Sequence, residues 1–173
     1  MTRRSLKTRL LIPALAAVLA PLSAFVTVLA VPGAAEAAVA KASCQVNAVL
    51  LSKDGDGTIP SELDFMKSTL QNDEFAAYKG FHLLERKELK LALDTKAEAS
   101  FTSGHRVGLT LLGGDETRLK LHADLSSRDA TKSLLSTDYS IEDNGLLMIG
   151  AGAYSDEKRS GKLFFAIQCG RVS

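Results

Sequence analysis

Apolar and polar residues alternate along much of this chain, which is the pattern of β-strands with one buried face. In residues 118–125 every second residue is apolar, from Leu119 to Leu125, and the residues between them are charged or polar. The same alternation runs through residues 44–50, 89–93, 107–111 and 163–169. The pattern predicts a mainly β fold with strands in these ranges.

Turn residues separate the alternating stretches at short intervals, as at Ser103-Gly104 and Gly113-Gly114. Asn144-Gly145 lies between residues 134–141 and 146–150. Asn-Gly is the strongest two-residue hairpin signal, so we expect the strands on its two sides to pair. Short turns between strands predict consecutive antiparallel hairpins, which form either an antiparallel β-sandwich or a partly closed barrel.

One helix is expected on the N-terminal side of these strands, over Ser61–Gln71. Ser61 can cap the helix, because Asp64 follows it by three residues as in a capping box. The apolar face of this helix consists of Leu63, Met66 and Leu70. A second short turn over Asp73–Lys79 presents Phe75 and Tyr78. We therefore expect a mainly β (α+β) fold with one N-terminal helix that covers a face or a mouth of the sheet.

The N-terminal segment has the three parts of a signal peptide. Residues 1–9 are basic, residues 10–31 are uncharged and apolar, and Pro32-Gly33 then precedes a run of small residues. This order predicts a signal peptide over residues 1–40, cleaved after Ala40 or after Ala37, and a single mostly-β domain over residues 41–173.

Two questions about this segment stay open. The apolar run is long enough to span a bilayer, so an uncleaved membrane anchor is one alternative. Arg3-Arg4 partly matches a twin-arginine signal, which leaves the export route open. By either export route, Sec or twin-arginine, we expect a periplasmic or secreted protein that has no stable membrane insertion after cleavage.

Cys44 and Cys169 lie at opposite ends of the predicted domain, each on the apolar side of its strand pattern. An exported protein enters an oxidising compartment, so we expect one disulfide that pins the first strand to the last. A redox pair of free thiols is the alternative, but no C-x-x-C motif supports it.

Charge narrows the classes of partner. The chain carries 21 Lys and Arg against 20 Asp and Glu, but four of the basic and one of the acidic residues lie in residues 1–40. Residues 41–173 therefore have a net charge of −2. This balance argues against binding to nucleic acid, which needs clustered basic side chains.

The segment from Lys53 to Ile59 resembles the middle of an EF-hand calcium loop. Asp54 and Asp56 fill two ligand positions, but Ser52 stands where the first carboxylate belongs, and Glu62 comes one residue too early. Most such segments are Asp/Gly turns, and we expect a turn here. Weak calcium binding through Asp54, Asp56 and Glu62 is the alternative.

Catalytic motifs are missing from the sequence. It contains no G-x-S-x-G elbow, no H-E-x-x-H helix and no cofactor motif, and His82, His105 and His122 lack metal-ligand spacing. Two carboxylates acting as acid and base remain an alternative, because only the fold shows which carboxylates meet.

Several short motifs occur in a recognisable order. They are Phe75-x-x-Tyr78-x-x-Phe81-x-Leu83-Leu84, Val107-x-Leu109-Thr110-Leu111-Leu112, Leu119-x-Leu121, the Leu/Gly-rich stretch 146–152, and Gly161-Lys162-Leu163. Over most of residues 46–167 this order resembles a family of small exported bacterial proteins, each with one mostly-β domain behind a signal peptide. The turn that often reads Pro-Asn-Gly in that family is Thr102-Ser103-Gly104 here. The family has no known activity, so the resemblance implies export and one β domain and assigns no site residue.

These observations predict an exported, non-catalytic domain that binds a partner in the cell envelope, an envelope or extracellular protein, without a cofactor. The sequence also fits an inhibitor of an extracellular enzyme, which is favoured if Ser155–Gly161 forms an exposed and rigid loop. It is compatible as well with an exported hydrolase that uses carboxylates and with a weak calcium-binding protein.

Overall fold

The computed structural model describes residues 39–172, so nearly all of the predicted signal peptide lies outside the described residues. Eight strands make up most of the described chain, and the mainly β prediction is confirmed. They are β1 (Lys41–Ser52), β2 (Gly80–Ala92), β3 (Lys96–Ser100), β4 (Arg106–Gly114), β5 (Arg118–Ser126), β6 (Ser133–Glu142), β7 (Leu146–Ser155) and β8 (Ser160–Arg171).

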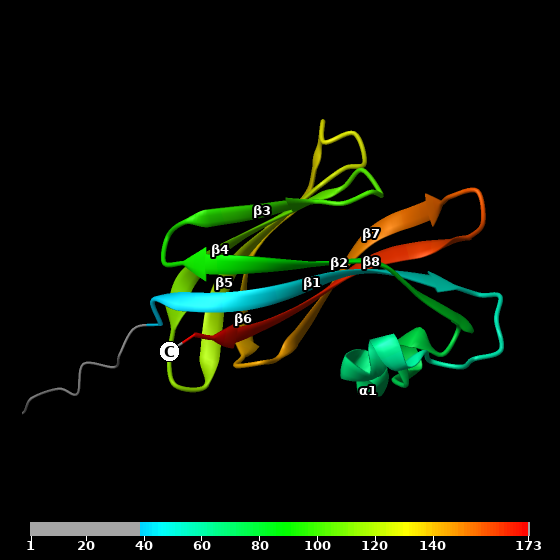
Figure 1. The fold of residues 1–173 in the computed structure, drawn as a ribbon, viewed down its shortest axis with the longest axis horizontal. Helices are drawn as coiled ribbons and strands as arrows, with labels where there is room; N and C mark the ends of the chain where they lie inside the picture. Colours follow the sequence, from blue (N-terminus) through cyan, green and yellow to red (C-terminus); the bar gives the residue numbers. More distant parts are fainter. Residues whose placement is uncertain (1–38, 173) are drawn as a thin grey trace, which may run out of the picture. The chain divides into compact units, whose positions relative to one another are not determined.

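The strands form two four-stranded antiparallel sheets (Figure 1). The first, in the order β2-β1-β8-β7, is called the β1 sheet here, and the second, in the order β3-β4-β5-β6, the β5 sheet. When the two sheets are considered together, strands that are consecutive in the chain are neighbours, and the pairing of β8 with β1 completes a ring. The ring lacks ladders between β2 and β3 and between β6 and β7, so residues 39–172 form no closed barrel.

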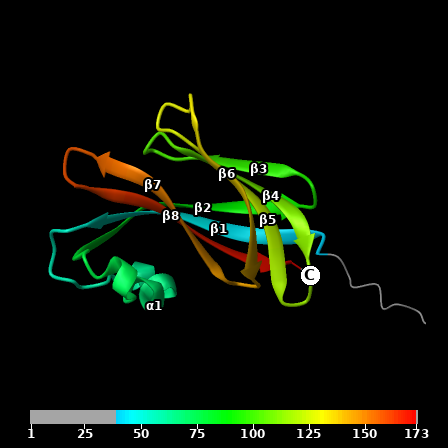
Figure 2. The ribbon, with the colours of Figure 1, turned by 180° about the vertical axis from the view of Figure 1, so that it is seen from behind.

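The prediction of a hairpin at Asn144-Gly145 is wrong. The chain does turn there, with Asn144 at a φ of 62°, but β6 pairs with β5 and β7 pairs with β8. The Asn144 N–H donates to the carbonyl of Cys169 on β8, at 2.8 Å. Figure 2 shows β6 and β7 running from this turn into different sheets. The Asn-Gly turn therefore marks the passage between the sheets.

A buried apolar cluster joins the inner faces of the two sheets. On β5 it takes Leu119, Leu121, Ala123 and Leu125, and on β8 Leu163, Phe165, Ile167 and Cys169. These residues are the ones that alternate in the sequence, because successive side chains on a strand point to opposite faces. The alternation therefore marked the inner face correctly on both strands.

The structure does not support the prediction of one N-terminal α-helix over Ser61–Gln71. A 3₁₀ helix, η1, covers Ser61–Met66, and an α-helix of four residues, α1, covers Lys67–Leu70. Pro60 holds the cap position, and Ser61 is the first helical residue and not the cap. In a 3₁₀ helix residues three apart lie on one side, which places Leu63 and Met66 together. A second 3₁₀ helix, η2 (Asp73–Phe75), follows.

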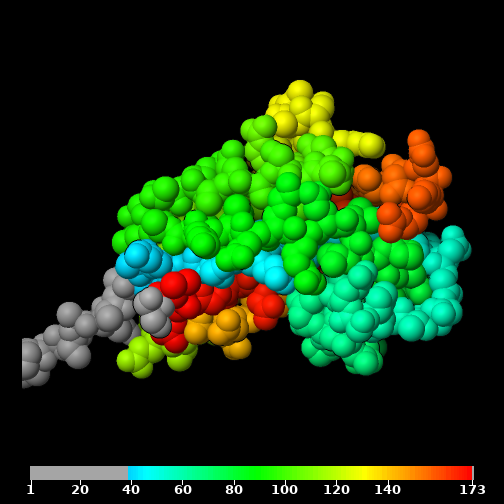
Figure 3. Space-filling model, in the orientation of Figure 1, coloured from blue at the N-terminus to red at the C-terminus, as the bar shows by residue number. Residues whose placement is uncertain are grey.

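The helical segment covers the outer face of the β1 sheet at one end. It buries Leu63, Met66, Leu70 and Phe75 against side chains that include Val49, Leu51, Phe81 and Ala166. The second half of β1 is consequently buried on both faces. Figure 3 shows the helical segment and the loop after β1 gathered beside the tip of the β7–β8 hairpin.

Candidate functional site

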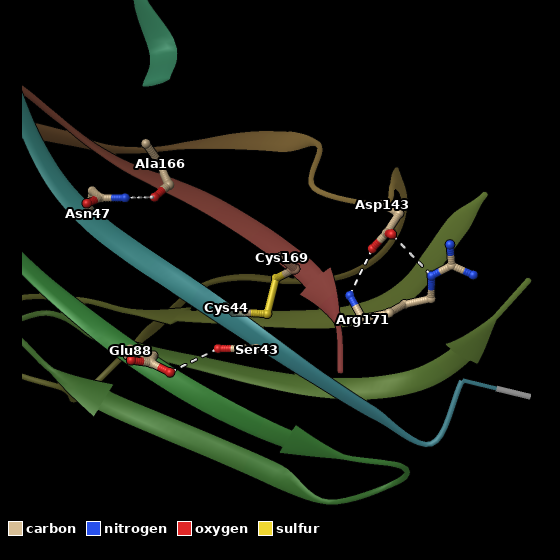
Figure 4. The surroundings of a disulfide bond; sticks show 8 residues. All are labelled: Ser43, Cys44, Asn47, Glu88, Asp143, Ala166, Cys169 and Arg171. Atoms are coloured by element: carbon tan, nitrogen blue, oxygen red, sulfur yellow. Dashed lines mark hydrogen bonds and ion pairs between the residues drawn. A yellow bond between two sulfur atoms is a disulfide. The ribbon is translucent and has the colours of Figure 1, made fainter. Parts of the chain in front are cut away.

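The predicted disulfide is confirmed, because Cys44 of β1 is bonded to Cys169 of β8. The two residues lie opposite each other in the ladder, and both side chains are buried between the sheets. Figure 4 shows the bond linking the two strands, near the ion pair of Asp143 and Arg171. Structural disulfides persist in oxidising compartments, so this bond suggests an extracellular or periplasmic environment.

The three carboxylates of the calcium hypothesis are not arranged as a set of ligands. Asp56 Oδ1 accepts the Thr58 N–H at 2.8 Å, and this hydrogen bond lowers the pKa of Asp56. Glu62 lies on η1, where its main-chain carbonyl accepts a hydrogen bond from Arg86. No group of three His, Cys, Asp or Glu side chains within residues 39–172 is placed to hold a metal ion.

The glycines of this loop have a packing role instead. The loop lies against the chain just before β2, where the Gly57 N–H donates to the carbonyl of Lys79 at 2.8 Å. The Lys79 N–H in turn donates to the carbonyl of Ser52 at 2.8 Å. A Cβ atom on Gly55 would lie 2.2 Å from the Lys79 oxygen, so no other residue fits there without a backbone shift. These hydrogen bonds therefore hold the loop against the end of the β1 sheet.

A cavity of about 520 Å³ lies beside the loop after β1 and is called the loop cavity here. It is lined by Leu51, Lys53 and Asp54 from the end of β1, by Ala77 and Tyr78 after η2, and by Ser160, Gly161 and Lys162 from the start of β8. These segments lie at the end of the β1 sheet farthest from the labelled C-terminus (Figure 1). Ligand-binding cavities in proteins fall in this range of size.

A smaller polar hollow of about 230 Å³ adjoins the loop cavity and shares Asp54 and Ser160 with it. Its other lining residues are Ser52, His82, Lys158 and Arg159. Arg159 Nε is buried and has no hydrogen-bond acceptor, although the same guanidinium lies 3.6 Å from Asp156 Oδ2. Arg159 therefore lines the hollow with one N–H group that has no acceptor.

The exposed loop predicted over Ser155–Gly161 forms one side of the loop cavity and of the polar hollow. The Asp156 carboxylate accepts the main-chain N–H groups of Lys158 and Arg159, at 2.9 and 2.7 Å. These hydrogen bonds lower the pKa of Asp156 and hold the turn between β7 and β8. The loop after β1 and this turn are far apart in the sequence, and the structure brings them together at one site.

A second polar cluster lies on the outer face of the β5 sheet. His122 Nδ1 is 2.5 Å from Asp138 Oδ1, and His122 Nε2 is 3.0 Å from Ser136 Oγ. Ser, His and Asp meet in this order in hydrolase triads, where the neutral imidazole takes the serine proton. Here the hydrogen bond to Asp138 raises the pKa of His122, and Ser136 Oγ donates to Asp124 instead. The cluster is therefore arranged as an ion-pair network.

The other two histidines lie apart from this cluster. His82 lines the polar hollow. His105 is buried, where its Nδ1 lies 3.1 Å from Ser103 Oγ and its ring packs against Phe165. Burial lowers the pKa of His105, which favours the neutral form of the ring.

The fold and the cavity define the class of protein, which is a mostly-β domain of two antiparallel sheets. A disulfide joins its first strand to its last, and it has a cavity at one end. A comparison of the chain with protein-family models and with curated proteins finds no match. Within residues 39–172, no helix has the length and apolar character needed to cross a membrane.

Proposed function

We propose that the chain is an exported domain that binds a partner in the cell envelope without catalysis, and that the loop cavity is its binding site. The observation that carries this proposal is the convergence of two hydrogen-bonded loops on one cavity of ligand-binding size. The two sheets share one buried cluster, which supports a β-sandwich as the scaffold. Membership of the family of small exported bacterial proteins is part of the same proposal.

Export rests on the order of basic, apolar and small residues in residues 1–40, together with the disulfide. Two contacts favour cleavage after Ala37 over cleavage after Ala40. Val39 is only 8% exposed and belongs to the core cluster, and the Ala40 carbonyl accepts the Leu93 N–H at 3.0 Å. Cleavage after Ala37 keeps both contacts in the mature domain, so we place the cleavage site there.

Cell fractionation followed by native mass spectrometry tests the proposal. We expect the protein in the periplasm or the medium, starting at Ala38, lighter by two hydrogen atoms, and carrying a bound molecule or protein. The matched variant is Ala77→Phe, because Ala77 is exposed and lines the loop cavity. The bound species should disappear from this variant. A full-length protein in the membrane, or a bound species that the variant retains, would contradict the proposal.

An inhibitor of an extracellular enzyme is the second candidate, and the turn between β7 and β8 favours it. Glu157 and Lys158 are exposed at the tip of this turn, while Asp156 fixes its main chain. Inhibitor loops gain affinity when their bound conformation is held in advance. The test is inhibition of secreted proteases by the protein and by its Lys158→Ala variant. Equal inhibition by the two proteins, or none by either, would remove this candidate.

A further inference from the structure

We propose that the loop cavity binds a single-chain fatty carboxylate, with the acyl chain inside the cavity and the carboxylate between Lys53 and Lys162. The inference rests on the proposed function, because it names the class of ligand for the same site. Two independent features carry it: the apolar interior of the cavity and the basic groups at its rim.

The interior is apolar and its shape is fixed. Leu51 is fully buried beneath the cavity, and Ala77 and Tyr78 present apolar surface to it. The Tyr78 ring stands edge-on to Phe164, with 6.4 Å between the ring centroids, which holds the tyrosine in place. An alkyl chain gains free energy in proportion to the apolar surface that it removes from water.

Gly161 lines the cavity at the point where β1 and β8 approach each other. A Cβ atom on Gly161 would lie 2.3 Å from the Leu51 carbonyl oxygen, so only glycine allows β1 and β8 to approach here. This side of the cavity is therefore main chain held in place by the pairing of β1 and β8. A site whose walls are ordered in advance spares a ligand the free energy of ordering them.

The rim supplies positive charge without partners of its own. None of the ion pairs formed by residues 39–172 includes Lys53 or Lys162. Asp54 is the one carboxylate that lines the loop cavity, against these two ammonium groups. Lys158 and Arg159 add positive charge in the adjoining polar hollow. The charge of the rim therefore complements an anion, and charge-assisted hydrogen bonds are the strong ones.

Size favours a single-chain ligand. A volume of about 520 Å³ suits a molecule with one short acyl chain, whereas a phospholipid brings two long chains and a larger headgroup. A carboxylate also matches two separate ammonium groups, each of which can donate to one oxygen. An anionic phospholipid shares the same chemistry and serves as a comparison in the test.

The test is isothermal titration of the mature protein with decanoate, with decanol as the neutral match and a short-chain phosphatidic acid as the phosphate match. We expect saturable decanoate binding and weaker binding of decanol and of the phosphatidic acid. Lys53→Ala/Lys162→Ala should weaken decanoate binding at least tenfold, because two charge-assisted hydrogen bonds are lost. Lys67→Ala/Lys120→Ala, two exposed lysines elsewhere, should leave binding unchanged. Ala77→Phe should abolish binding.

Each contrary outcome is informative. No decanoate binding, or equal binding of decanol, overturns the inference, and tighter binding of the phosphatidic acid assigns the site to a phospholipid instead. In these cases the proposed function still stands if native mass spectrometry finds another species that Ala77→Phe displaces. If Ala77→Phe retains the natural bound species, the proposed function fails as well.

Discussion

At the scale of single residues, Gly55 decides whether the loop after β1 can close against Lys79. The φ of Gly55 is +151°, and a Cβ atom there would lie 2.2 Å from a carbonyl oxygen. We expect Gly55→Ala to lower the free energy of unfolding by about 2–3 kcal/mol, since it adds a backbone clash to an unfavourable φ. Urea denaturation measures the change.

The matched control for this substitution is Gly57→Ala in the same loop. Gly57 has a φ of +83°, but its Cβ would meet only the Lys79 side chain, at 3.9 Å. We expect a loss of about 1 kcal/mol from the unfavourable φ alone. Equal losses at the two positions would show that the close approach of Gly55 to Lys79 is unimportant.

His122 should make stability depend on pH. Its hydrogen bond to Asp138 raises its pKa above 6.5, so folding favours the protonated ring. The stabilisation is therefore complete below about pH 6.5 and is lost as the pH rises through the folded-state pKa. We expect His122→Gln to cost about 0.5 kcal/mol at about pH 5.5, because exposed ion pairs contribute little, and less at about pH 8.5. Urea denaturation at both pH values checks this, and an equal cost at each would contradict it.

At the scale of elements, the helical segment stabilises the β1 sheet through buried side chains and gains little from its own hydrogen bonds. Within this segment Met66 is fully buried, and the next residue, Lys67, is exposed. We expect Met66→Ala to lower the free energy of unfolding by about 2–5 kcal/mol and Lys67→Ala by less than about 0.5 kcal/mol. A small effect at Met66 in chemical denaturation would mean that the segment packs loosely.

Strand ranges could be predicted well from the sequence, because alternation reports which residues face the core. Pairing could not be predicted in the same way. Asn144-Gly145 has the local preference of a hairpin turn, but the Asn144 N–H is taken by Cys169 of β8. The helix prediction erred for a similar reason, because apolar spacings of three fit a 3₁₀ helix as well as an α-helix.

At the scale of the whole molecule, the disulfide joins residues 125 positions apart in the sequence. Closing so long a loop restricts the unfolded chain, which in the chain-entropy model is worth about 4–5 kcal/mol. We expect Cys44→Ala/Cys169→Ala to lower the free energy of unfolding by up to this amount, measured by urea denaturation. Reductant should shift the wild-type midpoint in the same direction, and a midpoint that ignores reductant would contradict the prediction.

The two cysteines bear on one part of the site, the pairing of β1 with β8. Counting away from Cys44 and Cys169 along paired antiparallel strands brings Leu51 opposite Lys162, as the structure has it. The disulfide prediction placed the first and last strands together, and the structure adds their antiparallel pairing and register. The apolar interior could not be predicted, because it depends on how η2 lies against the end of the sheet.

The same disulfide determines how the domain responds to mechanical tension. The ends of β1 and β8 leave the domain side by side, where the Val172 N–H donates to the Lys41 carbonyl at 3.2 Å. Between these two strands, a force that pulls the ends apart would open the Lys41–Val172 hydrogen bond and the pairs Ala42–Arg171 and Ser43–Gly170 before the load reached a covalent bond. Tension would then pass from one strand to the other through sulfur, and the rest of the domain would stay folded.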